Sequence, residues 1–136
     1  MPMSAARADA ALDEALRGTA TPHVWLHIAN PTAVGTAGVA QDDAANIVRK
    51  AVTFAAPENH PDNVERRVLS TTLVEWLGTE IDASQSITHV SVWSAVSGGQ
   101  VEFIHALPSP VVVGSDGVRI EIGDIEHAIQ VYAKPA

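Results

Sequence analysis

The chain has 136 residues, a length that suits one domain with a single hydrophobic core. Its 16 Asp and Glu residues outnumber its 8 Lys and Arg, and the formal net charge of −8 repels nucleic-acid phosphates and anionic lipids. The absence of cysteine excludes disulfides, thiolate metal sites and cysteine nucleophiles. No apolar run is long enough to span a membrane. We therefore expect a globular chain that has neither nucleic acid nor a membrane as its partner.

Residues 4–17 predict a short N-terminal helix. Ser4 suits the N-cap, Gly18 follows the last turn, and one face carries apolar residues at helical spacing, namely Ala5, Ala8, Leu12, Ala15 and Leu16. A stripe made mostly of alanine buries little area, so the helix needs a surface on which to dock. Its own domain and a neighbouring subunit both remain open as that surface. We expect residues 1–20 to form a helical arm and residues 21–136 a β-sandwich domain.

Valine and isoleucine outnumber leucine, and most of them follow residue 47, which favours strands. The first predicted strand is His23–Ala29, where Val24, Leu26 and Ile28 alternate with His23, Trp25 and His27. The face that carries Trp25 is half polar and has one large ring. It is therefore typical of a surface that awaits a partner.

Further along the chain, residues 32–46 predict a loop and Arg49–Ala55 a strand. Residues 62–78 are ambiguous. Asp62 and Glu65 resemble a helix capping box, whereas the threonines, valines and Trp76 of Val68–Trp76 favour a strand. The local pattern leaves both alternatives open.

From residue 86 onward the pattern predicts strands. Ile87–Ser94 and Val101–Leu107 flank the turn Ser97-Gly98-Gly99 and form a hairpin, and two more strands follow the turn at Gly114–Gly117. The alternation changes parity at Gly123-Asp124, which predicts a turn or a bulge. The expected fold is therefore all-β: an antiparallel β-sandwich of about seven strands with a short N-terminal α-helix.

The sequence contains no motif for catalysis, nucleotide binding or metal binding. His23 and His27 share a strand face but lie about 13 Å apart along it at ~3.3 Å per residue. His89 and His105 lie on the two arms of the hairpin, with no carboxylate at ligand spacing beside them. We expect no catalytic residue, no cofactor and no metal site. A small metal-dependent hydrolase that acts through His89 or His105 is the weakest alternative.

Three segments resemble, in order and spacing, small tail-fibre-like, minor tail or head-decoration structural proteins of tailed bacteriophages. They are Leu26–Pro31 followed by Gly35, then Arg49–Pro57, and then Ile87–Ala95 with Gly98-Gly99 and Val101–Leu107. The resemblance covers about residues 24–133. It matches Val74-Glu75-Trp76 to a strand, so it implies strand in the ambiguous region. Pro57–Glu65 and Gly78–Ser84 depart from the family pattern.

The resemblance implies an architectural role in the virion for a protein made in the host cytoplasm, with no catalytic residues to transfer. We expect a non-enzymatic capsid decoration or minor tail component. Its partners would be copies of itself, for example in a trimer, and the major capsid or tail proteins. The candidate assembly interface is Leu12, Leu16 and Trp25. The main alternative is a carbohydrate-binding module for host attachment, which needs Trp25 or Trp93 exposed in a groove.

Overall fold

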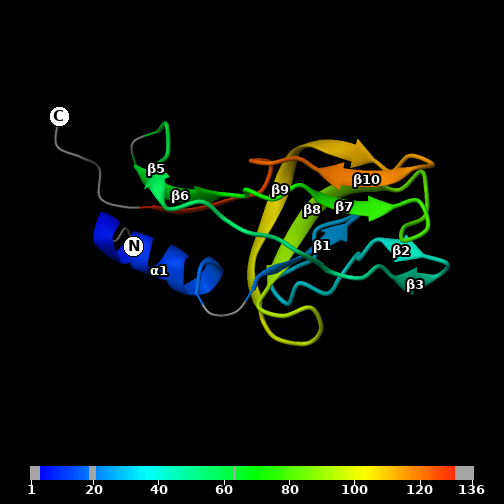
Figure 1. The fold of residues 1–136 in the computed structure, drawn as a ribbon, viewed down its shortest axis with the longest axis horizontal. Coiled ribbons are helices and arrows are strands. Elements are labelled where there is room, and N and C mark those ends of the chain that lie inside the picture. The colour runs from blue at the N-terminus through cyan, green and yellow to red at the C-terminus, as the bar shows by residue number, and fades with distance from the viewer. Residues whose placement is uncertain (1–3, 19–20, 63, 131–136) are drawn as a thin grey trace.

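The computed structural model describes residues 4–18, 21–62 and 64–130, and Figure 1 shows its fold. The described residues form one helix, α1 (Ala5–Leu16), and a series of strands. The longer strands are β1 (His23–His27), β6 (Glu65–Leu69), β7 (Val74–Leu77), β8 (Ser86–Trp93), β9 (Val101–Val112), β10 (Gly117–Ile120) and β11 (Glu126–Gln130). The two-residue strands are β2 (Gln41–Asp42), β3 (Ala45–Asn46), β4 (Lys50–Ala51) and β5 (Glu58–Asn59).

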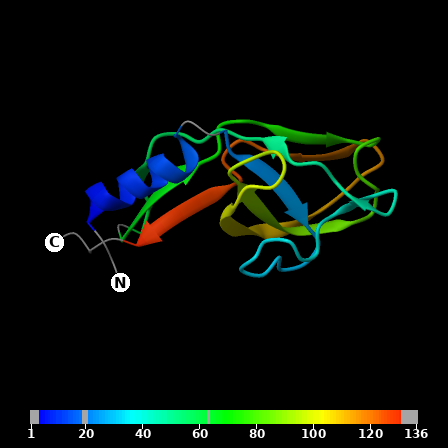
Figure 2. The same ribbon diagram turned by 90° about the horizontal axis from the view of Figure 1, so that it is seen from below.

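The body is an antiparallel sandwich of two layers, as predicted. One layer is the sheet β4-β1-β8-β9, and the other is the pair β10-β7 (Figures 1 and 2). The alternation of side chains along each strand turns one face inward. The core between the layers includes Val24, Leu26, Val90, Val92, Val74, Trp76, Val118 and Ile120. The indole N–H of Trp76 donates to the Val48 carbonyl at 2.7 Å, which satisfies its polar atom.

The helix α1 packs at one end of the sandwich against the sheet β11-β6-β5 (Figure 2). Ser4 caps it, because the Ser4 hydroxyl accepts the backbone N–H of Arg7 at 3.3 Å. Leu12 and Leu16 are buried in the core of their own chain, so the helix docks on that chain. The predicted limit between arm and sandwich falls at residues 19–20, outside the described residues. The division into two domains stays a prediction.

The ambiguous region is extended, so a helix over residues 62–78 is wrong. Asp62 does accept the backbone N–H groups of Val64 and Glu65, as in a cap, but the chain then enters β6 and pairs with β11. The cap-like signal therefore marks a turn. The β-branched residues that follow decide the outcome, because their long-range pairing overrides the local pattern.

Strand β9 lies at the edge of the larger sheet and carries Pro108 and Pro110. Its register against β8 breaks sharply: Ile87 pairs with Val111, whereas His89 pairs with Ala106. Residues 107–110 fall in that break. The hairpin predicted over Ile87–Leu107 is confirmed, and β9 extends five residues further than expected.

The parity change at Gly123-Asp124 reflects a change of sheet. Strand β10 pairs with β7, whereas β11 pairs with β6, and the turn between them has Gly123 at φ +88°. The predicted end of the last strand at Val131 lies outside the described residues. In the described part of the chain, no helix has the length and apolar character that crossing a membrane requires.

Candidate functional site: a cavity around Arg49

The outer face of the larger sheet is aromatic and polar, and part of it is covered. Trp25 of β1 and Trp93 of β8 meet edge to face, with ring centroids 5.9 Å apart. His27 is fully buried under the segment that precedes β2, because its Nδ1 lies 2.8 Å from the Ala37 carbonyl. The expected open surface at His27 is therefore wrong. A loop that the strand pattern does not reveal covers this part of the face.

A chain of hydrogen bonds runs under that loop. A carbonyl only accepts, so Nδ1 of His27 donates to Ala37, and Nε2 then accepts from the Ser91 hydroxyl at 2.6 Å. The same hydroxyl accepts the indole N–H of Trp93 at 2.8 Å. Burial lowers the pKa of His27, which keeps the ring neutral near pH 7. Gly35 is part of this cover, and a Cβ there would lie 2.9 Å from the Trp93 ring.

Arg49 lies against the two indoles. Its guanidinium carbon is 3.9 Å from the centroid of the Trp93 ring and 4.5 Å from that of Trp25, which is cation–π geometry. Its Nη1 donates to the carbonyls of Ala95 at 3.0 Å and Gly98 at 2.7 Å. These contacts hold the loop between β8 and β9 against the segment that precedes β4.

The charge of Arg49 is only partly compensated. The residue is 9% exposed, and burial lowers the pKa of its guanidinium. Within the described residues, Arg49 forms no ion pair. The cations that do form ion pairs with Asp or Glu are Arg17, Lys50, Arg66, Arg67 and Arg119. Within the described residues, no nitrogen of Arg49 is both fully buried and without a partner, so Nε and Nη2 keep some contact with solvent.

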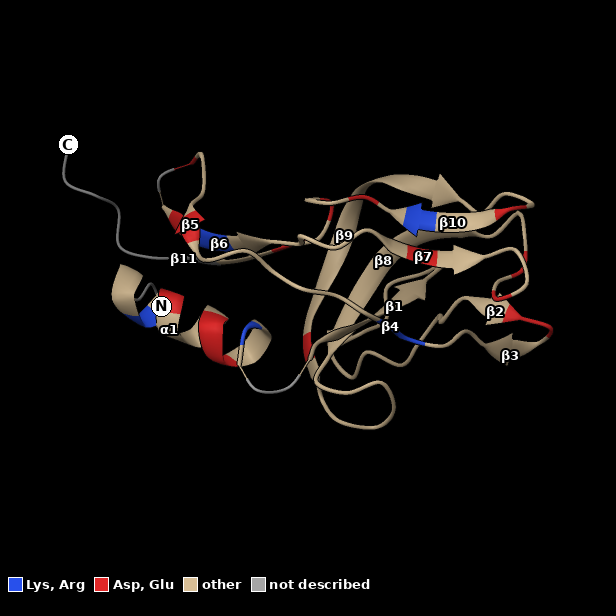
Figure 3. Cartoon of the chain, viewed as in Figure 1, with Lys and Arg blue, Asp and Glu red and all other residues tan. Residues whose placement is uncertain are grey.

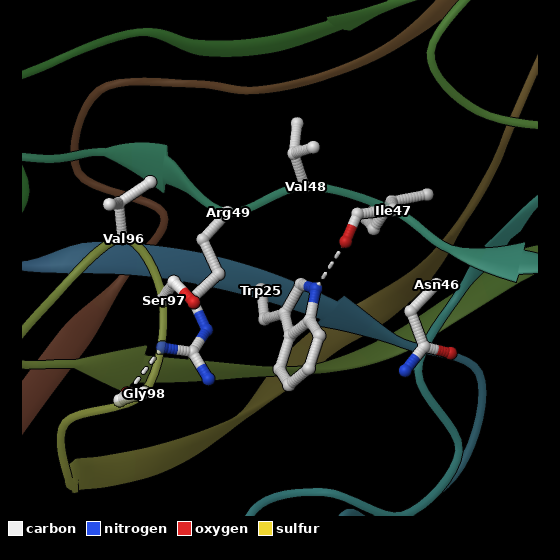
Figure 4. Close-up of a pocket in the computed structure, with 8 residues that line it drawn as sticks. All are labelled: Trp25, Asn46, Ile47, Val48, Arg49, Val96, Ser97 and Gly98. Carbon is white, nitrogen blue, oxygen red and sulfur yellow. Dashed lines mark hydrogen bonds between the residues drawn. The ribbon is translucent and has the colours of Figure 1, made fainter.

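A cavity of about 490 Å³ opens beside this cluster (Figure 4). Its lining residues are Trp25, Asn46, Ile47, Val48, Arg49, Val96, Ser97 and Gly98. The half-buried indole of Trp25 is held by a hydrogen bond from its N–H to the Ile47 carbonyl at 2.7 Å. Val48 and Val96 are 56% and 58% exposed and flank the cavity with aliphatic surface. The cavity therefore combines a recessed cation, an indole and two exposed valines.

The sequence-predicted interface residues do not come together here. Trp25 lines the cavity, whereas Leu12 and Leu16 lie in α1 outside its lining, covered by their own chain. A role for the three in an assembly interface stays a prediction. The sequence pattern did not single out Arg49, Val48 and Val96. The available signal was an arginine in a valine-rich segment with no acidic residue within five positions of it.

The predicted histidine pairs do not form a common site. The register places His105 opposite Val90 and His89 opposite Ala106, so the two imidazoles leave the sheet on opposite faces. His105 belongs to the inner face, where burial lowers its pKa and its Nε2 has no partner among the described residues. The inner-face position of His105 separates it from the Arg49 cavity, which lies on the outer face.

In each of two groups of side chains, the atoms that could bind a metal ion lie within 4.8 Å of one another. One group is His60, Asp62 and Glu65, and the other is Asp42, Asp43 and Asp82. Hydrogen bonds account for both, because Asp62 caps its own turn and the Asp82 carboxylate accepts the backbone N–H of Asp43. Figure 3 shows that acidic residues occur on most parts of the chain, so such groupings are expected here.

The comparison with protein families agrees with the resemblance seen in the sequence. The family described as Podophage GP4 fiber I protein gp80 matches residues 2–128, nearly the whole chain. No curated protein matches the chain. The match shows the class of protein: the chain is a structural protein of the phage virion, assembled into the particle after synthesis in the host cytoplasm. Within that class, it belongs to the Podophage GP4 fiber I protein gp80 family. Membership of a fibre family implies association with other virion components.

Proposed function

We propose that the chain is a non-enzymatic component of the phage tail that works as a homo-oligomer and contacts neighbouring tail proteins. The family match to a fibre protein supports the tail rather than the capsid surface. The observation that carries the contact role is the Arg49 cavity, where a buried cation lies between exposed valines. Arginine, tryptophan and aliphatic side chains in one patch are typical of the centre of a protein interface.

The candidate interface residues take different parts in this proposal. Trp25 belongs to the contact surface, because its half-buried ring lines the cavity. Leu12 and Leu16 face the core of their own chain and affect the assembly by fixing the position of α1. Substitution of both leucines with Asp is therefore expected to release α1 and, with it, to reduce incorporation into particles.

The carbohydrate-binding alternative receives less support. Trp93 is only 6% exposed, and the Arg49 guanidinium occupies one face of the Trp25 ring. A sugar that stacks on an indole needs a free face of that ring. The hydrolase alternative named His89 or His105; the two leave the sheet on opposite faces, and neither lines the Arg49 cavity.

Immunogold electron microscopy of purified particles tests the proposal. Antibodies raised against the folded chain are expected to label the tail. Label distributed over the capsid would support a decoration protein instead, and particles without label would overturn the structural role. Light scattering of the purified chain is expected to give a mass that is a small multiple of the monomer, such as a trimer.

A further inference from the structure

The Arg49 cavity is electrostatically incomplete in the single chain. A cation that is removed from water without a counter-ion costs free energy, and aromatic rings and carbonyl oxygens compensate only part of that cost. Nε and Nη2 of Arg49 still have donors to offer on the solvent side. A carboxylate is the group that fits, because a guanidinium binds its two oxygens in a fork geometry.

The mouth of the cavity indicates where that carboxylate comes from. Val48 and Val96 flank the opening, and the cation is recessed behind them. A sugar acid would place hydroxyl groups against the two valines, which offer no hydrogen bond, and only Asn46 and Ser97 add polar side chains to the lining. An Asp or Glu side chain instead has an aliphatic stem that passes the valines and a carboxylate that reaches Arg49. Protein side chains therefore fit better than a saccharide.

The chain itself carries a segment with the matching chemistry. Glu121 and Ile122 lie at the turn between β10 and β11, where the Asp124 carboxylate accepts the backbone N–H of Glu121. Ile122 is 64% exposed, and the Glu121 carboxylate forms no ion pair within the described residues. The Asp124 carboxylate in the same turn is already engaged with the backbone N–H of Glu121, and two further exposed carboxylates each lack one of these properties. Glu75 is paired with Arg119, and Asp116 has no large aliphatic neighbour in its turn.

We propose that the Arg49 cavity of one copy receives the Glu121 carboxylate of a second copy, while Ile122 packs between Val48 and Val96. This inference rests on the proposed self-association and names the surfaces that carry it. The two surfaces lie on different edges of the sandwich, as the loop after β8 and the turn after β10 show in Figure 1. A contact between unlike surfaces is head to tail, and copies joined in this way close into a ring when the rotation permits.

Sedimentation equilibrium of the full chain and four single variants tests the contact. Glu121→Arg reverses the incoming charge, and Val48→Asp places a carboxylate in the lining of the cavity, where it repels the incoming Glu121. Both positions are exposed, so both variants should fold. Each is expected to weaken self-association at least ~10-fold. The matched controls are Asp116→Arg in another exposed turn and Val34→Asp at another exposed valine, and both should associate like the wild type.

A charge exchange provides the decisive measurement. Arg49→Glu alone should lose association, and the double variant Arg49→Glu with Glu121→Arg should recover at least ~10-fold of it, because the ion pair is restored with its ends exchanged. Since Arg49→Glu also removes the bonds to Ala95 and Gly98, near-ultraviolet circular dichroism accompanies it. The Val48→Asp variant keeps those bonds and tests the same cavity independently.

The outcomes separate this contact from the proposed function. Association of the wild type that is unchanged in Glu121→Arg and Val48→Asp would overturn the contact and leave self-association standing. A wild-type chain that stays monomeric at millimolar concentration would overturn the proposed self-association itself. Quenching of tryptophan fluorescence by galacturonic acid that Val48→Asp abolishes, with no effect of Glu121→Arg on mass, would assign the cavity to an acidic sugar and overturn the contact.

Discussion

Two regions of the molecule use arginine in opposite ways. Where α1 meets β6, Arg66 donates to both carboxylate oxygens of Asp9, at 2.7 and 3.0 Å, and so fastens the helix to the sheet. At the outer face of the larger sheet, Arg49 is more deeply buried and has aromatic rings and carbonyls as its neighbours. The first arrangement is complete within one chain. The second leaves donors unused, which is the reason why we propose a partner contact there.

The largest expected effect concerns the packing of α1 on the core. Leu12→Ala should lower the free energy of unfolding by about 2–5 kcal/mol, because it removes a fully buried side chain between α1 and the core. Urea denaturation followed by circular dichroism measures the change. Ala11→Gly on the exposed side of the same helix is the control for helix propensity and should cost only ~1 kcal/mol. Equal losses in both variants would show that α1 is not docked on its own chain.

The next largest effect concerns the loop at Gly35, which covers part of the outer face of the larger sheet. Gly35→Ala should destabilise the chain by roughly 1–3 kcal/mol, because φ there is +74° and the new Cβ would meet the Trp93 ring. A shift in tryptophan emission should accompany the loss. Gly98→Ala is the matched control: φ is similar at +63°, but nothing lies within 4 Å of the Cβ position. An unchanged emission spectrum in Gly35→Ala would contradict the contact with Trp93.

The two arginines should also differ in their response to salt. Asp9→Asn should cost about 0.5–1 kcal/mol at low salt and less at high salt, because the pair is partly exposed and screening weakens it. Arg49→Met should cost about 1–2 kcal/mol through lost stacking and two lost hydrogen bonds, with little dependence on salt. Thermal denaturation at two NaCl concentrations measures both. A strong salt dependence for Arg49→Met would indicate a carboxylate partner within the same chain.

The smallest expected effect is a loss of stability at acidic pH. Burial lowers the pKa of His27 in the folded chain, so the unfolded chain binds the proton more readily and stability falls as the pH drops below the ordinary histidine value of about 6.5. Burial also lowers the pKa of His105 and of His127, so both residues contribute to the loss of stability in acid. Urea midpoints measured between pH 7.5 and 5 should decrease, and His27→Gln should make the decrease less steep. The same slope in both proteins would show that His27 does not contribute.

Features that depend on neighbours in sequence could be predicted. The cap at Ser4, the buried side of α1 and the hairpin around Gly98 each arise from residues a few positions apart. The alternating strands predicted the sandwich, because period-two burial specifies which face enters the core. The cap-like pair Asp62 and Glu65 was compatible with helix and strand alike, since a turn uses the same side-chain hydrogen bonds.

Features that depend on distant segments could not be predicted. His27 is buried because the loop that contains Ala37 folds back over β1. Arg49 becomes a central residue only when Trp25, Trp93 and the loop at Gly98 meet around it. The sequence singled out Trp25, but the residues that line the cavity with it come from two other parts of the chain. A local sequence pattern therefore could not predict the contacts among these residues.

The break in strand β9 has a consequence for how copies can join. A long strand at the border of a sheet normally offers a row of free backbone groups to which another chain can add a strand of its own. Pro108 and Pro110 take two N–H donors out of that row, and the register jump bends what remains. Both features disfavour the pairing of β9 with a strand of another copy. We expect particles built from this subunit to stop at a fixed copy number instead of growing into endless ribbons.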